Sequence, residues 1–291
     1  MSLPATRRGL ILGGAAALAA LPGCASAARR GRDFKEIETS LGATLGLYAR
    51  DVASGKVVRW RARERFPMAS TFKAFLAGVV LKRVDAGLER LDRTLAIPVE
   101  TLSNSPRTQA NAGGRMSVEA LCAAIVTVSD NTGANLLLDT IGGPAGLTRE
   151  LRALGDRSTR LDRYELAMNE AAPGDPRDTT TPEAAAGTLE KLVLGTVLSA
   201  ASRERLTRWM AESTTGLHRI RAGVPKDWRV ADKTGTGGRG STNDVAVIWP
   251  TKGGPVVMTA YLLGSTRPRV EREAALAAAA WTATESLGFD A

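Results

Sequence analysis

Segments with strand character occur at both ends of the chain, and they enclose a long middle part with helical periodicity. The predicted strands are residues 43–50, 56–60, 228–231, 244–249 and 256–263. An alanine-rich helical segment at residues 270–287 closes the chain. This order predicts that the two ends build one α/β unit around an antiparallel sheet and that the middle is an inserted helical unit.

The middle part carries the 3.6-residue apolar period of amphipathic helices. The predicted helices are residues 72–85, 117–128, 131–141, 146–154, 182–194 and 202–210. We therefore expect an α/β protein of the α+β type, with an antiparallel sheet flanked by terminal helices and an inserted all-helical domain. The expected α/β domain comprises residues 28–66 and 211–291, and the helical domain comprises residues 67–210. A stretch with little periodicity, residues 161–181, indicates a functional loop inside the helical part.

The first 27 residues are typical of an export signal. A charged start with Arg7 and Arg8 precedes an apolar run and then the small residues Ala25-Ser26-Ala27, which resembles a twin-arginine signal. The apolar run is too short to cross a bilayer as a helix. Cleavage after Ala27 is expected, with lipidation at Cys24 as the alternative. Export to the periplasm, or secretion, would leave Cys122 as a lone buried thiol without a disulfide partner.

The basic balance of the chain does not indicate a nucleic-acid partner. The formal net charge is +9, but basic residues alternate with acidic ones, no Lys/Arg run exceeds two, and aromatic residues make up only 4% of the chain. A stacking surface for bases is therefore not expected. We also expect no stable membrane insertion, and a monomer.

The single histidine limits the catalytic chemistry that the chain can perform. A zinc hydrolase needs several His, Cys or carboxylate ligands, so no metal or other cofactor is expected. A Ser-His-Asp triad could use only His218, which lies in a polar, turn-like segment. A nucleophilic serine would instead need another base, and a buried lysine with a lowered pKa is the next candidate.

The segment Ser70-Thr71-Phe72-Lys73 offers such a pair. Ser70 is predicted at a helix N-terminus, and Lys73 follows on the same face one turn later, so the hydroxyl and the amine can meet. The helix dipole would favour an oxyanion beside Ser70. Taken alone, the S-x-x-K spacing is also compatible with a helix cap followed by a surface lysine.

Two further motifs follow in order, Ser129-Asp130-Asn131 between two predicted helices and Lys233-Thr234-Gly235 at a strand after Ala231. The first could be a helix cap and the second a turn. A phosphate loop is excluded because the G-x-x-x-x-G-K-[ST] spacing is absent. The S-x-x-K, S-D-N and K-T-G trio is the signature of class A β-lactamases and penicillin-binding proteins.

From Gly42 onward the chain resembles the class A serine β-lactamase family. Residues 161–179 resemble the Ω loop of that family, with Glu165 and Asn169 four residues apart. The resemblance implies an Arg163–Asp178 salt bridge that closes this loop; an ordinary surface ion pair is the alternative. The family often has proline after the loop glutamate, where this chain has Leu166, and we predict a cis Glu165–Leu166 peptide bond.

The resemblance also implies a role for each site residue. Ser70 would attack the lactam carbonyl, whose oxyanion would lie between the backbone N–H groups of Ser70 and Thr236. Lys73 and Ser129 would carry a proton to the ring nitrogen, and Glu165 would activate the hydrolytic water; either Lys73 or Glu165 takes the first proton. The implied substrate-binding residues are Asn131, Asn169, Lys233, Thr234, Gly235, Thr236 and Arg219.

The expected function is hydrolysis of penicillins and cephalosporins, leading to β-lactam resistance. Glu165 separates this function from that of a transpeptidase or carboxypeptidase, which also forms an acyl intermediate on serine but lacks a base placed to hydrolyse a β-lactam adduct. A non-catalytic penicillin sensor is a second alternative. Asn104 stands where many members carry an aromatic residue, and Thr242 stands where some carry an arginine whose charge Arg219 would supply. Arg219 with Thr236 resembles members that also hydrolyse carbapenems.

Overall fold

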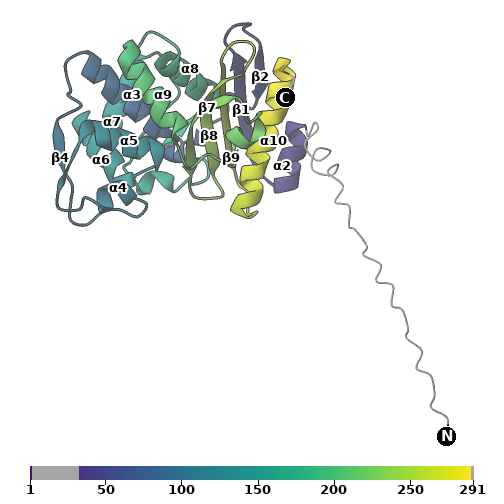
Figure 1. Ribbon diagram of the computed structural model, residues 1–291, viewed down its shortest axis with the longest axis horizontal. Helices are drawn as coiled ribbons and strands as arrows, with labels where there is room; N and C mark the ends of the chain where they lie inside the picture. The colour runs from purple at the N-terminus through teal and green to yellow at the C-terminus, as the bar shows by residue number, and fades with distance from the viewer. Residues whose placement is uncertain (2–32, 290–291) are drawn as a thin grey trace. The chain divides into compact units, whose positions relative to one another are not determined.

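A five-stranded antiparallel sheet is built from both ends of the chain in the computed structural model, which describes Met1 and residues 33–289 (Figure 1). Its strands are β1 (Thr44–Asp51), β2 (Val57–Trp60), β7 (Arg229–Thr236), β8 (Thr242–Trp249) and β9 (Val256–Leu263). They lie in the order β2-β1-β9-β8-β7, and every neighbouring pair is antiparallel. The pairing of β1 with β9 joins the N-terminal hairpin to the C-terminal strands, which confirms the sheet predicted from the sequence.

Two helices cover one face of this sheet (Figure 1). They are α2 (Phe34–Leu41) and α10 (Arg269–Leu287). Alternate residues of the strands, such as Leu45 and Leu47 of β1, point to this face and pack against Leu276 and the alanines of α10. Helix α2 was not recognised as a separate element in the sequence; it spans only two turns, from the Asp33 cap to Gly42, whose left-handed φ of 56° ends it.

The other α-helices of the described residues form the inserted helical part, on the other side of the sheet (Figure 1). They are α3 (Phe72–Asp85), α4 (Pro106–Gln109), α5 (Val118–Thr127), α6 (Asn131–Thr140), α7 (Gly143–Ala153), α8 (Pro182–Val193) and α9 (Ala200–Ala211). Helix α3 is buried continuously from Phe72 to Leu81, as expected for a helix enclosed by others. It carries Lys73 into the interior, and this position decides the chemistry of the site.

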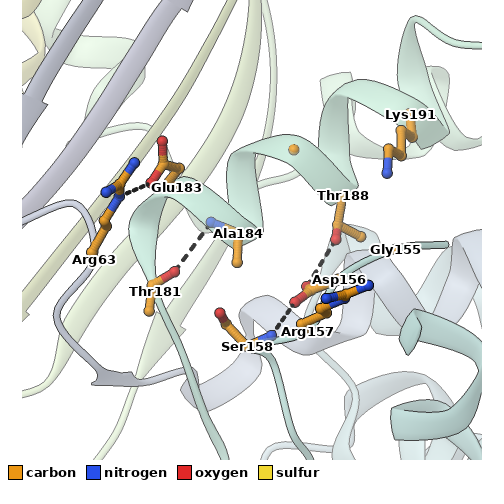
Figure 2. Close-up of a pocket in the computed structure, with 11 residues that line it drawn as sticks. Arg63, Gly155, Asp156, Arg157, Ser158, Thr181, Glu183, Ala184, Thr188 and Lys191 are labelled. Carbon is orange, nitrogen blue, oxygen red and sulfur yellow. Dashed lines mark hydrogen bonds and ion pairs between the residues drawn. The ribbon is translucent and has the colours of Figure 1, made fainter. Parts of the chain in front are cut away.

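The loop between α7 and α8 is fastened to the start of α8 by side chains (Figure 2). Thr181 caps α8 by accepting a hydrogen bond from the backbone N–H of Ala184. Thr188 donates to Asp156 at 2.9 Å, and Asp156 also accepts from the backbone N–H of Ser158. The bonds to Asp156 hold the chain just before it enters the Ω loop, and the Thr181 cap holds it just after the loop ends.

Two short strand pairs were not predicted from the sequence. They are β3 (Phe66–Pro67) with β6 (Thr179–Thr180) and β4 (Thr94–Ala96) with β5 (Arg115–Ser117). Segments of two or three residues are too short to show the two-residue period of a strand. The β3–β6 pair joins the end of the Ω loop to the residues before Ser70, so the loop and the serine share one support.

The predicted long helices and strands are confirmed with small shifts at their ends. Strand β7 extends beyond the predicted residue 231 through the Lys233-Thr234-Gly235 motif, and Cys122 is a fully buried free thiol. Among the described residues no helix is long and apolar enough to cross a membrane. The export signal at 1–27, with Cys24, lies outside the described residues except for Met1. Residues 33–289 belong to one compact unit, and the predicted domain boundaries stay a prediction.

Candidate active site

Ser70 lies in a tight turn, the 3₁₀ helix η1 (Ala69–Thr71), that leads directly into α3. Ala69 before it has a left-handed φ of 44°, which is rare for a residue with a side chain and is found most often at functional sites. Strand β7 passes against this turn at Gly235, where a Cβ would lie 2.6 Å from the carbonyl oxygen of Met68. Glycine therefore allows the β7 backbone to approach Ser70.

Lys73 is completely buried one turn after Ser70. Its Nζ lies 3.0 Å from Glu165 Oε1 and donates to the Ser129 carbonyl at 2.9 Å and to Asn131 Oδ1 at 2.5 Å. Burial lowers the pKa of Lys73, and the Glu165 carboxylate opposes this effect. Within residues 33–289, no hydrogen bond joins the Lys73 amine to Ser70 Oγ. The direct contact suggested by the S-x-x-K spacing is therefore not formed.

Glu165 reaches the serine from the Ω loop. Its Oε1 accepts a hydrogen bond from Ser70 Oγ at 3.4 Å, and its Oε2 accepts one from Asn169 at 2.5 Å. Asn135 of α6 holds the backbone of Glu165 on both sides, since it accepts from the N–H and donates to the carbonyl. The predicted cis Glu165–Leu166 bond is confirmed. Asn135 was missed in the sequence; its only signal there is its place one helical turn after Asn131.

Ser129 joins the two buried lysines at the junction of α5 and α6. Its Oγ lies 3.1 Å from Lys233 Nζ and 3.4 Å from Lys73 Nζ, and its φ of 62° places it in the left-handed region. Asp130 fixes this junction by capping α6 and accepting from the backbone of Thr108. Burial lowers the pKa of Lys233 well below its usual value, and the positive charge of Lys73 lowers it further.

Arg219 is a third buried cation near the pocket. It donates to the carbonyls of Gly235 and Asn243 at 2.8 and 2.7 Å, to Thr236 Oγ1 at 2.7 Å, and to Glu273. Its side chain is only 1% exposed, so Arg219 is a buried cation and not a surface arginine. Burial lowers its pKa, and negative neighbours including Glu273 oppose the shift. Glu273 comes from α10, far along the sequence, and no local pattern indicated it.

These groups meet at one hollow of about 480 Å³. Of the predicted site residues, its lining includes Ser70, Ser129, Asn131, Asn169, Arg219, Thr234 and Thr236. Lys73, Glu165 and Lys233 lie behind this lining and contact it through the hydrogen bonds above, while Gly235 supports the Ser70 turn. His218 is exposed and does not line the hollow. The three sequence motifs and the Ω loop are therefore brought together around one serine.

Comparisons with known proteins agree with this arrangement. A sequence profile described as the β-lactamase enzyme family matches residues 29–287. The carbapenem-hydrolyzing β-lactamase KPC of Klebsiella oxytoca is 46% identical over 259 residues, which cover 88% of each chain. β-Lactamase L2 of Stenotrophomonas maltophilia is 45% identical over 247 residues, which cover 84% of this chain and 82% of the relative.

A solved structure extends the likeness to three dimensions. The class A β-lactamase of the last common ancestor of Gram-negative bacteria matches with a TM-score of 0.85 at 51% identity, covering 87% of this chain and 97% of that chain. The chain belongs to the β-lactamase enzyme family. As a class A β-lactamase it is a serine hydrolase of the β-lactam amide, the activity that underlies β-lactam resistance.

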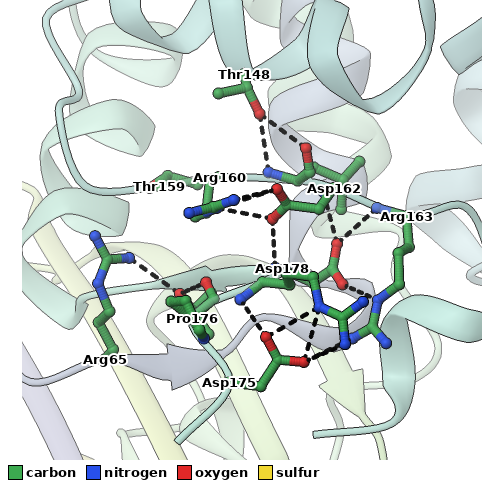
Figure 3. A network of polar contacts seen from close by, with 12 residues as sticks. Arg65, Thr148, Thr159, Arg160, Asp162, Arg163, Asp175, Pro176 and Asp178 are labelled. Carbon is green, nitrogen blue, oxygen red and sulfur yellow. Dashed lines mark hydrogen bonds and ion pairs between the residues drawn. The ribbon is translucent and has the colours of Figure 1, made fainter.

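The Ω loop of this β-lactamase is closed by a buried carboxylate (Figure 3). Asp178 lies 2.6 Å from Arg163 Nε and accepts from the backbone N–H groups of Asp162 and Arg163. Asp162 in turn accepts from the N–H of Asp178 at 3.0 Å. The predicted Arg163–Asp178 bridge is confirmed, and it is not a surface pair because the Asp178 side chain is 1% exposed.

Asp178→Asn is expected to destabilise the protein. The amide keeps the shape of the side chain but removes the charge that accepts three hydrogen bonds, and hydrogen bonds to a charged group contribute about 1.5–3 kcal/mol. We expect a Tm lower by roughly 4–8 °C, measured by calorimetry. Asp92→Asn is the control, since Asp92 pairs with Arg90 at the exposed surface. Equal Tm changes in the two variants would show that the Asp178 contacts stabilise the protein no more than an exposed ion pair does.

Proposed function

We propose that Ser70 is the nucleophile of this class A β-lactamase and that Glu165 activates the water that hydrolyses the acyl-enzyme. The observation that carries this proposal is the buried Lys73–Glu165 pair, whose shared carboxylate oxygen also lies 3.4 Å from Ser70 Oγ. A carboxylate within hydrogen-bond reach of the nucleophile can direct a water in the second step, and either this carboxylate or the lysine paired with it can accept the serine proton in the first step.

In acylation, the proton of Ser70 passes toward the leaving nitrogen of the lactam. Glu165 is the group in contact with the hydroxyl, and Lys73 connects Glu165 to Ser129 through its Nζ. Ser129 lines the pocket, so its hydroxyl can deliver a proton to the ring nitrogen. Lys233, on the other side of Ser129 Oγ, stabilises the serine oxygen while the proton leaves.

The oxyanion of the tetrahedral intermediate is proposed to lie between the backbone N–H groups of Ser70 and Thr236. The close approach of β7 to the Ser70 turn at Gly235 supports this arrangement because it aligns both backbones along one edge of the pocket. Asn131 is proposed to hold the side-chain amide of the substrate. It lines the pocket, and its own amide is oriented by Lys73 and the Ser103 carbonyl.

The carboxylate of the substrate is proposed to bind at Lys233, Thr234, Thr236 and Arg219. Thr234 and Thr236 line the pocket from β7, the buried Arg219 also lines it, and the buried Lys233 lies behind this lining. Hydrogen bonds orient each hydroxyl, since Thr236 accepts from Arg219 and Thr234 contacts Thr215 at 2.6 Å. Two positive charges removed from water attract an anionic group more strongly than exposed ones.

Arg219→Met is expected to raise KM for a penicillin about tenfold, with a smaller fall in kcat, because it removes a charge that acts on the bound carboxylate. Steady-state kinetics on benzylpenicillin measure the effect. Arg267→Met, at an exposed arginine paired with Glu271, is the control. A variant with lowered Tm but unchanged KM would assign Arg219 a structural role alone.

For deacylation, Glu165 and Asn169 are proposed to hold the hydrolytic water between the acyl carbonyl and the Glu165 carboxylate. Asn169 donates to Glu165 Oε2, which leaves Oε1 directed at Ser70. The test of the whole scheme is nitrocefin turnover followed by absorbance, with mass spectrometry of Ser70. A protein that stops after one equivalent would instead be a penicillin-binding enzyme or a sensor.

Carbapenems are the further substrates that we propose. The contact between Arg219 and Thr236 supports this, as does the 46% identity to the carbapenem-hydrolyzing β-lactamase KPC. Ala69 and Gly237 cannot form a disulfide beside the serine, although a Cβ at Gly237 would lie 3.4 Å from the Ala69 Cβ. Imipenem hydrolysis above the buffer background is expected, and a rate equal to the background would restrict the enzyme to penicillins and cephalosporins.

We also propose export to the periplasm by the twin-arginine-like signal, with the mature protein a monomer. Arg7, Arg8 and the small residues up to Ala27 support the signal. Replacing both arginines by lysine should block export, so that the β-lactamase activity is found in the cytoplasm. N-terminal sequencing of the exported protein distinguishes cleavage after Ala27 from lipidation at Cys24. Light scattering of the purified protein tests the monomer.

A further inference from the structure

A second hollow, of about 470 Å³, lies beside the start of the Ω loop and shares no lining residue with the Ser70 pocket. Among residues 33–289, four arginines line it, Arg65, Arg149, Arg152 and Arg160, and Asp162 is the only carboxylate in its lining. We call it the arginine pocket. Figure 3 shows Arg65, Arg160 and Asp162 beside the network that closes the Ω loop.

Three separate segments bring these arginines together. Arg149 and Arg152 lie on one face of α7, with Thr148 beside them. Thr148 exchanges hydrogen bonds of 2.9 and 3.0 Å with the backbone of Leu161, which fixes the start of the Ω loop against this helix. Arg65 immediately precedes β3. The pocket is therefore set by the same contacts that hold the Ω loop, and its geometry is predefined.

The positive charge of the pocket is mostly uncompensated. Arg160 pairs with Asp162 at 2.5 Å. Within residues 33–289, however, Arg65, Arg149 and Arg152 form no ion pair. Arg65 and Arg152 each use one Nη to bind neutral oxygens, which are backbone carbonyls and one threonine hydroxyl. Three guanidinium groups around one hollow repel each other, and a bound anion would relieve that repulsion.

In a neighbouring hollow, several of the charged groups have partners within the protein (Figure 2). There Arg63 pairs with Glu183 at 2.8 Å, and Asp156 accepts hydrogen bonds from Thr188 and the Ser158 backbone. In the arginine pocket, by contrast, Arg65, Arg149 and Arg152 remain exposed to solvent. A dissolved anion can reach them.

We propose that the arginine pocket binds a multivalent phosphate, of the pyrophosphate or phosphate monoester type. Guanidinium groups match phosphate oxygens with two parallel hydrogen bonds, which an ammonium group cannot do. Hydrogen bonds to backbone carbonyls already hold Arg65 and Arg152, so little side-chain freedom is lost on binding. A ligand with at least two negative charges balances the unpaired arginines.

Calorimetric titration of the full chain with inorganic pyrophosphate, at constant ionic strength, tests this site. Saturable binding of one equivalent is expected. Arg149→Gln should raise Kd about tenfold or more, because a charged hydrogen-bonding partner is lost. Arg149 is exposed, and within residues 33–289 its side chain makes no hydrogen bond, so this variant should fold. Arg65→Lys, which keeps the charge but not the fork, should also weaken binding.

Arg208→Gln is the matched control, because it removes the same charge from an exposed position on α9 outside the pocket. It should leave Kd unchanged. Absence of pyrophosphate binding to the wild type would overturn the proposal, and so would an equal loss in Arg149→Gln and Arg208→Gln, which would mean a diffuse attraction to net charge.

The phosphate could be dissolved or could belong to a lipid headgroup. Co-sedimentation with phosphatidylcholine vesicles that contain phosphatidic acid distinguishes these sources. Sedimentation that is reversed by pyrophosphate and lost in Arg149→Gln identifies a headgroup in the arginine pocket. Pyrophosphate binding without sedimentation identifies a free phosphate in the same pocket. Sedimentation that Arg149→Gln does not change would exclude the pocket as the lipid site.

Discussion

Glu165→Ala is expected to convert the enzyme into one that acylates but does not turn over. Without the carboxylate, the water that attacks the Ser70 ester has no base, and general-base catalysis contributes roughly 10²–10⁴ in rate. Nitrocefin should give a burst of about one equivalent followed by a rate reduced by at least that factor. Mass spectrometry should find the covalent adduct on Ser70 as the main species.

Glu170→Ala is the matched control for this variant. Glu170 is a second carboxylate of the same loop, but its side chain is 58% exposed and it binds Arg163 rather than the serine. It should turn over nitrocefin at nearly the wild-type rate. If Glu165→Ala also turns over normally, another group activates the water. If the wild type itself stalls as an adduct, the protein is a penicillin-binding enzyme or sensor and our interpretation of the Ω loop is wrong.

The motifs were visible in the sequence because each is local. Helix α3 has the predicted bounds, residues 72 to 85, and the S-D-N motif lies between α5 and α6 as expected. Apolar periodicity indicates such elements because it reflects which face is buried. The cis bond at Glu165 and the Arg163–Asp178 bridge were available only through the family resemblance, since no spacing rule reveals them.

Contacts between distant segments could not be predicted in this way. Asn135 holds the Glu165 backbone from another element, and Glu273 reaches Arg219 from α10. Both are ordinary polar residues on helices, whose local pattern says nothing about a partner far along the chain. The direct Ser70–Lys73 contact that helical spacing suggested is replaced by Glu165, which lies within reach of both side chains. Tertiary contacts, and not helical spacing alone, therefore determine the hydrogen-bond partners of the buried Lys73.

Lys73→Met is expected to block the first step instead of the second. The substitution keeps an unbranched chain of similar length inside α3 but removes the amine that binds Glu165, Asn131 and the Ser129 backbone. With the connection between Glu165 and Ser129 gone, the proton of Ser70 has no path to the lactam nitrogen. Acylation should slow by roughly 10²–10⁴, seen as slow appearance of the Ser70 adduct in a mass-spectrometric time course.

The rate at which the Ser70 adduct forms shows whether Lys73 or Glu165 takes the first proton. Lys82→Met is the control, on the same helix but at a partly exposed lysine that pairs with Glu150, and it should acylate normally. A thermal melt ensures that Lys73→Met is folded. If folded Lys73→Met acylates as fast as the wild type, Glu165 alone takes the proton and water replaces the Lys73–Ser129 path. If acylation is slow while Glu165→Ala still forms its adduct quickly, Lys73 rather than Glu165 governs the first proton transfer.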